Sequence, residues 1–223
     1  MRKRRKSRDA EPVEDATAPE APAAEQAEPA GSAPPTGPWD ASEVQIDEED
    51  GSRVDLGALV IKGREGVEVR LQADQATGQV QAVMLVASDG AMELRPFAAP
   101  RNESIWDDIR TRLAAEATRR GGNAAEVEGP YGTALQMVLP VTTQDGQQGS
   151  QASTVLGIAG PRWLLRVSTF GRPAAQYQED GLLEQVLRDV VVVRGSAPMS
   201  PGESIPLVLP AGARRVQRPA PDA

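Results

Sequence analysis

The sequence predicts an α+β fold in which two helices pack on a mainly antiparallel sheet of about six to eight strands. Short segments with alternating apolar and polar residues, separated by turns rich in Gly, Pro and Asp, predict strands joined as hairpins. Two longer segments carry apolar residues at helical spacing. Neighbouring strands with short connections pair antiparallel. Helices often pack on one face of an antiparallel sheet, so we expect both helices to cover one face.

The expected strands are short and rich in Val, Leu, Ile and Met. They are predicted over 54–61, 67–72, 80–87, 92–97, 124–128, 135–141, 154–158, 163–167 and 190–194. Ser88-Asp89-Gly90 predicts a hairpin turn. Because Pro lacks a backbone N–H, Pro96 predicts that the end of its strand lies at an edge.

The first helix is predicted over 104–120, with Ser104 as its N-cap and Gly121-Gly122 as its end. Its apolar face consists of Trp106, Ile109, Leu113 and Ala117. The second helix is predicted over 179–189. Its expected buried face consists of Leu182, Leu183, Val186 and Leu187.

The charges divide the chain. Six basic residues occupy positions 1–8, and 9–50 hold thirteen acidic and no basic residues, whereas 51–223 are nearly neutral. The segment 1–36 cannot bury enough apolar surface to offset its loss of conformational entropy, so we predict a disordered, basic-then-acidic tail. A single domain is predicted over 37–210, with its core from about residue 54, and 211–223 are predicted to be a flexible C-terminal tail.

Trp39 stands out because it directly follows the polar tail. It either binds a partner or docks onto the domain, and docking is favoured because the apolar Val44 and Ile46 follow it. Trp163 follows Arg162 after a Gly-Pro turn, and the pair could stack on a ligand. The alternation of Trp163 with Leu165 and Val167 instead favours the core.

No Cys and no His occur in the chain, which excludes disulfides, thiol nucleophiles, His-based triads and zinc sites of the Cys/His type. The acidic run Asp47–Asp50 lacks the alternating ligands of a calcium loop. No phosphate-binding or dinucleotide-binding glycine motif is present. We therefore expect no cofactor and no metal, identify no catalytic residue and lean towards a protein that is not an enzyme.

Several phrases resemble an uncharacterised actinobacterial family of unknown function, DUF3710. They occur in order: Gly37-Pro-Trp-Asp40, Val54-Asp-Leu-Gly-Ala58, Ala99-Pro-Arg101 followed by Trp106-Asp107, Gly129-Pro-Tyr-Gly132, Gly160-Pro-Arg-Trp-Leu-Leu-Arg166, Val191-Val-Val-Arg-Gly195, Pro198-Met199 and Pro201-Gly202. The resemblance implies a single domain over about 37–210 and brings no catalytic residues. The order of elements is also similar to that of the Mog1/PsbP-type sandwich, a fold usually used to bind partners.

The preferred function is a non-enzymatic, cytoplasmic protein-binding or adaptor domain. A basic start not followed by an apolar stretch does not match a signal peptide, and no apolar run is long enough to cross a membrane. One alternative is a hydrolase-like enzyme using Asp, Glu and Arg, for which a cleft containing Arg101, Arg166 or Arg172 with a carboxylate would argue. The other is weak binding of nucleic acid or an anionic surface by the basic cluster, which consists of Arg2, Lys3, Arg4, Arg5, Lys6 and Arg8.

Overall fold

The computed structural model describes residues 37–47, 50–74, 77–101, 103–143 and 145–210. Several predicted features therefore lie outside the described residues. These are the tail over 1–36 with its basic cluster, part of the acidic run at 48–49, and the C-terminal tail over 211–223.

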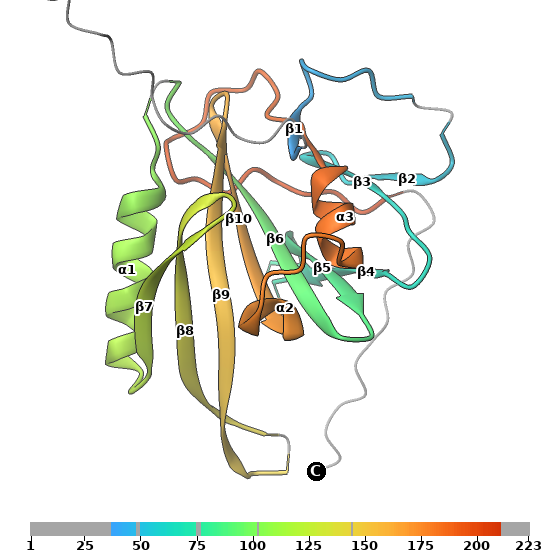
Figure 1. The fold of residues 1–223 in the computed structure, drawn as a ribbon. Helices are drawn as coiled ribbons and strands as arrows, with labels where there is room; N and C mark the ends of the chain where they lie inside the picture. The colour runs from blue at the N-terminus through green and yellow to red at the C-terminus, as the bar shows by residue number, and fades with distance from the viewer. Residues whose placement is uncertain (1–36, 48–49, 75–76, 102, 144, 211–223) are drawn as a thin grey trace, which may run out of the picture. The chain divides into compact units, whose positions relative to one another are not determined.

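Seven strands form a large sheet in which every neighbouring pair is antiparallel (Figure 1). Their order across the sheet is β4 (Glu68–Ala73), β5 (Val80–Ala87), β6 (Gly90–Ala98), β10 (Trp163–Gly171), β9 (Gln148–Gly160), β8 (Gly132–Thr142) and β7 (Asn123–Gly129). Most links between neighbours in the sheet are short hairpins. The predicted α+β class with a mainly antiparallel sheet is confirmed.

A second sheet of four short strands was not predicted. Its order is β1 (Trp39–Asp40), β11 (Val191–Val192), β3 (Leu59–Lys62) and β2 (Arg53–Asp55). The single strand predicted over 54–61 is in fact β2 and β3 with a tight turn between them. Gly57 lies in that turn at φ +78°, a backbone conformation that favours glycine, and its N–H donates to Asp55 Oδ1 at 2.8 Å.

The two faces of the large sheet carry separate apolar cores, because successive side chains of a strand point to opposite sides. On β10, Leu164 packs with helix α1 (Trp106–Arg119), whereas Leu165 packs with helix α3 (Leu182–Arg188) and the small sheet. The expectation that both helices cover one face is therefore wrong. That expectation required one apolar and one polar face, whereas the strands around β10 are apolar on both faces.

Helix α1 begins two residues later than predicted, with Ile105 instead of Ser104 at the N-cap position. The Ser104 hydroxyl still accepts a hydrogen bond from the backbone N–H of Trp106 at 3.2 Å. Trp106 and Ala117 are buried against the sheet, and Ile109 and Leu113 are partly buried beside them. The indole of Trp106 donates to the carbonyl of Thr133 on β8 at 2.7 Å.

Helix α3 buries three of its four predicted apolar residues, Leu183, Val186 and Leu187. The fourth, Leu182, is 42% exposed, so its assignment to the buried face is wrong. Glu184 takes a buried position in its place. The helix starts at residue 182 and has only seven residues, so its first position lies at the end of the packed stripe. A further short helix, α2 (Arg172–Ala175), was not predicted.

Pro96 lies on a central strand, because β6 pairs with both β5 and β10. The pairing of β6 with β5 nevertheless ends at Leu94, so Pro96 lies beyond the last paired residue on that side. There the Pro96 carbonyl accepts a hydrogen bond from the N–H of Ile205 at 3.0 Å. The predicted sheet edge therefore exists only around Pro96, where the segment containing Ile205 pairs with β6.

Trp163 is a core residue, only 2% exposed, as its alternation with Leu165 and Val167 predicts. Its indole N–H donates to Asp40 Oδ2 at 2.7 Å, which connects the N-terminal strand to the large sheet. Although burial alone would raise the pKa of Asp40, hydrogen bonds from Ser42 and Trp163 hold that pKa below its ordinary value.

Replacing Asp40 should therefore destabilise the protein in a pH-dependent way. The folded-state pKa lies below the unfolded value of about 3.9, so the stabilisation is fully present above about pH 4 and is lost as the pH falls through the folded-state pKa. At neutral pH we expect Asp40→Ala to lower the free energy of unfolding by about 1–3 kcal/mol, because it leaves the indole N–H of Trp163 without its acceptor.

Denaturant unfolding at neutral and acidic pH measures this effect, with the exposed Asp180→Ala as the control. The control is expected to stay within about 0.5 kcal/mol of the parent. A difference between Asp40→Ala and the parent that does not narrow below about pH 4 would contradict the account.

Candidate functional site

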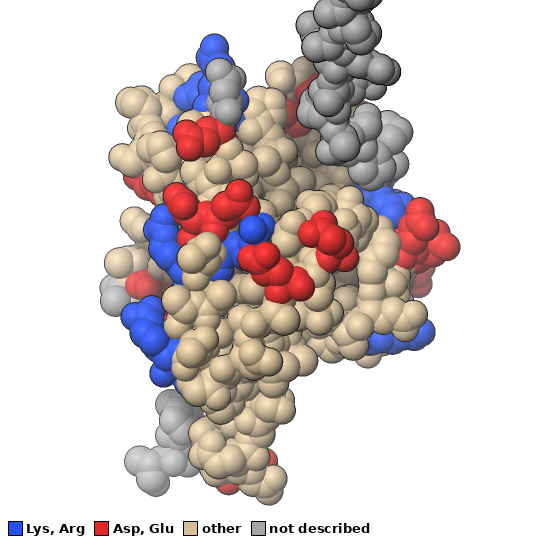
Figure 2. All heavy atoms as spheres, turned by 60° about the vertical axis from the view of Figure 1, so that its left-hand side comes forward, with Lys and Arg blue, Asp and Glu red and all other residues tan. Residues whose placement is uncertain are grey.

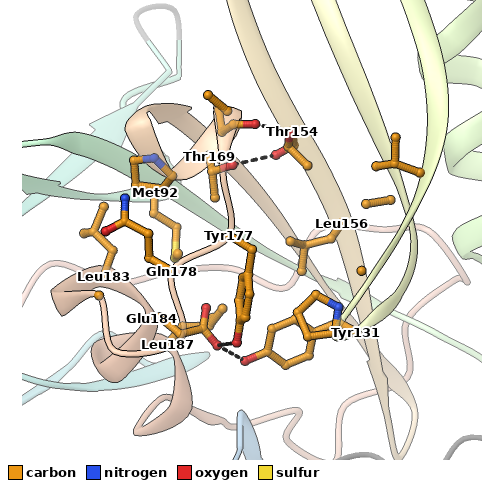
Figure 3. Close-up of a pocket in the computed structure, with 18 of the residues that line it drawn as sticks. Met92, Tyr131, Thr154, Leu156, Thr169, Tyr177, Gln178, Leu183, Glu184 and Leu187 are labelled. Atoms are coloured by element: carbon orange, nitrogen blue, oxygen red, sulfur yellow. Dashed lines mark hydrogen bonds between the residues drawn. The ribbon is translucent and has the colours of Figure 1, made fainter.

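A cavity of about 210 Å³ opens between the large sheet and the segment that runs from α2 to α3. It lies on the face of the large sheet on which α3 packs, whereas α1 packs on the opposite face. Figure 1 shows these helices, and Figure 3 shows the residues that line the cavity. Its walls come from β6, β8, β9 and β10, from the β7–β8 turn, and from α2 and α3. Lining side chains include Met92, Tyr131, Ala134, Thr154, Leu156, Thr169, Tyr177, Gln178, Leu183, Glu184 and Leu187.

The β7–β8 turn brings Tyr131 to the cavity. Its sequence, Gly129-Pro130-Tyr131-Gly132, reverses the chain, and Gly132 lies at φ +88°. A glycine takes this conformation without steric cost, so the turn can close tightly over the sheet. As a result Tyr131 reaches Glu184, which is 53 positions later in the chain.

The carboxylate of Glu184 forms the polar end of the cavity, and its Oε1 accepts three hydrogen bonds. Tyr131 OH donates at 2.5 Å, Tyr177 OH at 3.2 Å and Arg188 Nε at 3.3 Å. A guanidinium nitrogen of Arg188 also donates to Tyr177 OH at 3.1 Å. Figure 3 shows both tyrosine hydroxyls converging on this one oxygen. Glu184 itself is only 7% exposed, so its charge is buried but paired.

The remaining walls are mainly apolar. Met92, Leu156, Leu183 and Leu187 line the cavity together with Glu184 (Figure 3). The Thr154 hydroxyl donates to the Ala174 carbonyl at 2.7 Å, and the Thr169 hydroxyl donates to the Thr154 carbonyl at 3.1 Å. The side-chain nitrogen of Gln178 is buried without a hydrogen-bond partner among the described residues.

Both tyrosines are held in the neutral form. Burial raises the pKa of Tyr131 far above its ordinary value, and the neighbouring Glu184 carboxylate raises it further. Burial also raises the pKa of Tyr177. The hydrogen bond with Tyr177 raises the pKa of Arg188, so Arg188 stays a cation. The network thus consists of two neutral donors and one cation around one carboxylate.

The raised pKa values predict that the tyrosines resist ionisation in the folded protein. The chain has two tyrosines, Tyr131 and Tyr177, so a titration of tyrosinate absorbance reports on this site alone. We expect both to ionise above the ordinary value of about 10 in native buffer, and near it in denaturant. The network's stabilisation is therefore present below about pH 10 and is lost as the pH rises through the folded-state values.

In the same titration, Tyr131→Phe should remove the transition at the higher pH. Identical curves for the parent in native buffer and in denaturant would contradict the described network.

The arginines that would argue for an enzyme do not come together in this cavity. Arg166 lies on the other face of the sheet, 3.4 Å from Glu93 and 5.6 Å above the Phe97 ring centre. Arg172 is exposed at the start of α2. Arg101 lines a separate hollow beside Glu103 and Ser104. None of the three lines the cavity that contains Glu184.

The two suggested contact residues also lie elsewhere. Trp39 is half-buried in β1, where its N–H donates to the Val190 carbonyl at 2.9 Å. Arg162 lies in the β9–β10 turn at φ +63°, and its carbonyl accepts hydrogen bonds from Ala99 and Arg194. A partner contact at either residue stays a prediction. The basic cluster at 2–8 lies outside the described residues.

Sequence reasoning missed Tyr131, Tyr177, Glu184 and Arg188 as a site. Gly129-Pro-Tyr-Gly132 was identified only as one of the phrases shared with a family, and Glu184 was not singled out in the predicted helix. The one available signal was the spacing of Glu184 and Arg188, which puts them on the same side of a helix. Nothing in the sequence connects that pair with a turn more than fifty positions earlier.

The described residues contain no group of three or more His, Cys, Asp or Glu side chains that could hold a metal ion. Within the same ranges, no helix is long and apolar enough to span a membrane.

Comparison with known proteins gives a family but no function. Residues 37–216 match the family described as "Protein of unknown function (DUF3710)". No curated protein sequence matches. Among solved structures, the solution structure of cyanobacterial PsbP (CyanoP) from Synechocystis sp. PCC 6803 is similar at 10% identity over 67% of this chain and 98% of that chain, with a TM-score of 0.35. The order of elements predicted a Mog1/PsbP-type layout. A TM-score of 0.35 is too low for this similarity to support any further argument.

Proposed function

Because the chain belongs to the DUF3710 family of proteins of unknown function, we propose its function from its own geometry: a non-catalytic binding domain whose cavity receives a side chain of a protein partner. The observation that carries the proposal is the cavity itself. Apolar walls that end in a few fixed polar groups are the usual form of a binding pocket. At about 210 Å³ the space suits one side chain.

Exposed apolar side chains beside the cavity favour a protein as the partner. Tyr177 is 44% exposed and Leu182 is 42% exposed, and both line the cavity. Aromatic residues next to a pocket that accepts an anchoring side chain are typical of energetically important positions in protein interfaces. On a surface of this kind, the exposed side chains contact the partner around the cavity while the cavity holds the anchoring side chain.

The chemistry of the lining supports binding over catalysis. Glu184 Oε1 accepts hydrogen bonds from two tyrosines and Arg188, which hold the carboxylate in place as an acceptor. The raised pKa values of Tyr131 and Tyr177 keep both as hydrogen-bond donors. The hydroxyls of Thr154 and Thr169 donate to backbone carbonyls, so neither has a base to activate it.

The charge distribution supports a protein partner over a nucleic acid. Residues 51–223 hold nearly equal numbers of acidic and basic side chains, whereas nucleic-acid-binding domains carry a basic excess. On the face shown in Figure 2, acidic and basic side chains are interspersed, and the lower part of this face carries few charged side chains.

Site-specific photo-crosslinking in cell lysate tests the proposal. A photo-reactive amino acid at Leu182 should give a discrete adduct with a protein. The matched control is Leu209, which is 46% exposed and does not line the cavity. The same adducts from both positions, or none from Leu182, would refute a protein-binding cavity.

A further inference from the structure

The charges that line the cavity have one sign. Asp89, Glu128 and Glu184 contribute to the lining, and no Lys or Arg does so within the described part of the chain. Arg188 contacts Glu184 without lining the cavity itself. A group that enters the cavity therefore meets carboxylates and apolar surface, so a cation is favoured over an anion.

The second oxygen of Glu184 has the capacity to receive such a group. All the hydrogen bonds that Glu184 accepts from the described residues reach Oε1. Oε2 is not among the buried atoms that lack a partner, so solvent or a ligand can reach it. In Figure 3 the two oxygens diverge, and Oε2 points away from Tyr131 towards the other lining side chains.

The shape of the lining adds a second requirement. Met92, Leu156, Leu183 and Leu187 line the same cavity as Glu184, and they would contact an apolar stem. Long basic side chains combine an apolar stem with a charged end that donates hydrogen bonds. A carboxylate already fixed by Tyr131, Tyr177 and Arg188 needs no rearrangement to accept one more donor.

We infer that the anchor received by the cavity is a long basic side chain of a partner protein, with its charged end donating to Glu184 Oε2 and its stem against Met92 and Leu156. The inference rests on the proposed function and adds the chemistry of the anchor. Asp89 and Glu128 add to the negative potential that favours the cation. Arg188 keeps Oε1 occupied, so the incoming donor is directed to Oε2.

Titration of the full-length protein, followed by amide NMR shifts, tests the inference with matched probes. Butylguanidinium is compared with butylurea, which has a similar shape but no charge. The tripeptide acetyl-Ala-Arg-Ala-amide is compared with its citrulline counterpart. We expect both cationic probes to bind about tenfold or more tightly than their neutral counterparts, and to shift amides of lining residues, because charge-assisted hydrogen bonds are roughly twice as strong as neutral ones.

Two variants localise the effect. Glu184→Gln should abolish the preference for the cation, whereas Glu65→Gln, an exposed residue outside the cavity, should keep it. Because the wild-type comparison of charged with neutral probes needs no variant, the test remains decisive even if Glu184→Gln fails to fold.

The contrary outcomes separate the two claims. Equal binding of the charged and neutral probes in the cavity would overturn the basic anchor and leave the binding cavity intact. Binding of butylguanidinium but not of the arginine peptide would overturn the assignment to a protein side chain. Binding of no probe would overturn the inference, while crosslinking from Leu182 judges the proposed function independently.

Discussion

Leu187→Ala is expected to lower the free energy of unfolding by about 2–5 kcal/mol. Leu187 is completely buried, where α3 packs on the large sheet and the small sheet. Removing its side chain loses apolar burial and leaves a hole that the surrounding core fills only in part. The effect is therefore the largest that we expect from a single truncation in this helix.

Leu182→Ala is the matched control, because it makes the same chemical change in the same helix at a residue that is 42% exposed. Both variants replace leucine by alanine, so the difference between their losses reflects mainly burial. Chemical denaturation should put Leu182→Ala within about 0.5 kcal/mol of the parent. Equal losses in the two variants would show that α3 packs with a different face.

Gly157→Ala should destabilise the protein by about 1–3 kcal/mol through overpacking. Gly157 lies on β9 directly beneath the ring of Trp106, and a Cβ at this position would come within 2.5 Å of ring atom Cδ2. The ring has little freedom to move, because its N–H donates to the Thr133 carbonyl and Trp106 is only 7% exposed. Its hydrogen bond and its packing therefore oppose the added methyl group.

Gly149→Ala serves as the control on the same strand. A Cβ at Gly149 meets nothing closer than 3.9 Å, and alanine costs less conformational entropy than glycine in a strand. Thermal or chemical unfolding should therefore show no loss for Gly149→Ala. The packing of Trp106 on Gly157 would be disproved if the two glycine variants behaved alike.

Local patterns were enough to predict most of the large sheet. β5 occupies the predicted residues 80–87, and the turn after it leads directly into β6. The phase of Trp163 was also correct, because alternation on a strand fixes which residues share a face. In such segments the sequence period alone determines both the element and its buried side.

Features that depend on distant pairing could not be predicted in this way. β1 lies parallel to β11, which pairs Trp39 with Val191 across most of the chain. These strands have two residues each, too few to show a period. Helix α3 buries Glu184, and not Leu182 as predicted, because Tyr131 from another part of the fold stabilises the Glu184 carboxylate. The candidate site was missed for the same reason.

The central claim, that the cavity is where a partner binds, is tested most directly by crosslinking from Leu182 in a protein whose cavity is filled. Ala134 is 4% exposed and lines the cavity from β8, so Ala134→Leu adds apolar volume inside the space. Comparing the unfolding midpoints of the variant and the parent checks that the fold is retained. The account predicts that the adduct from Leu182 disappears in the folded Ala134→Leu protein, and an adduct of undiminished yield would contradict it.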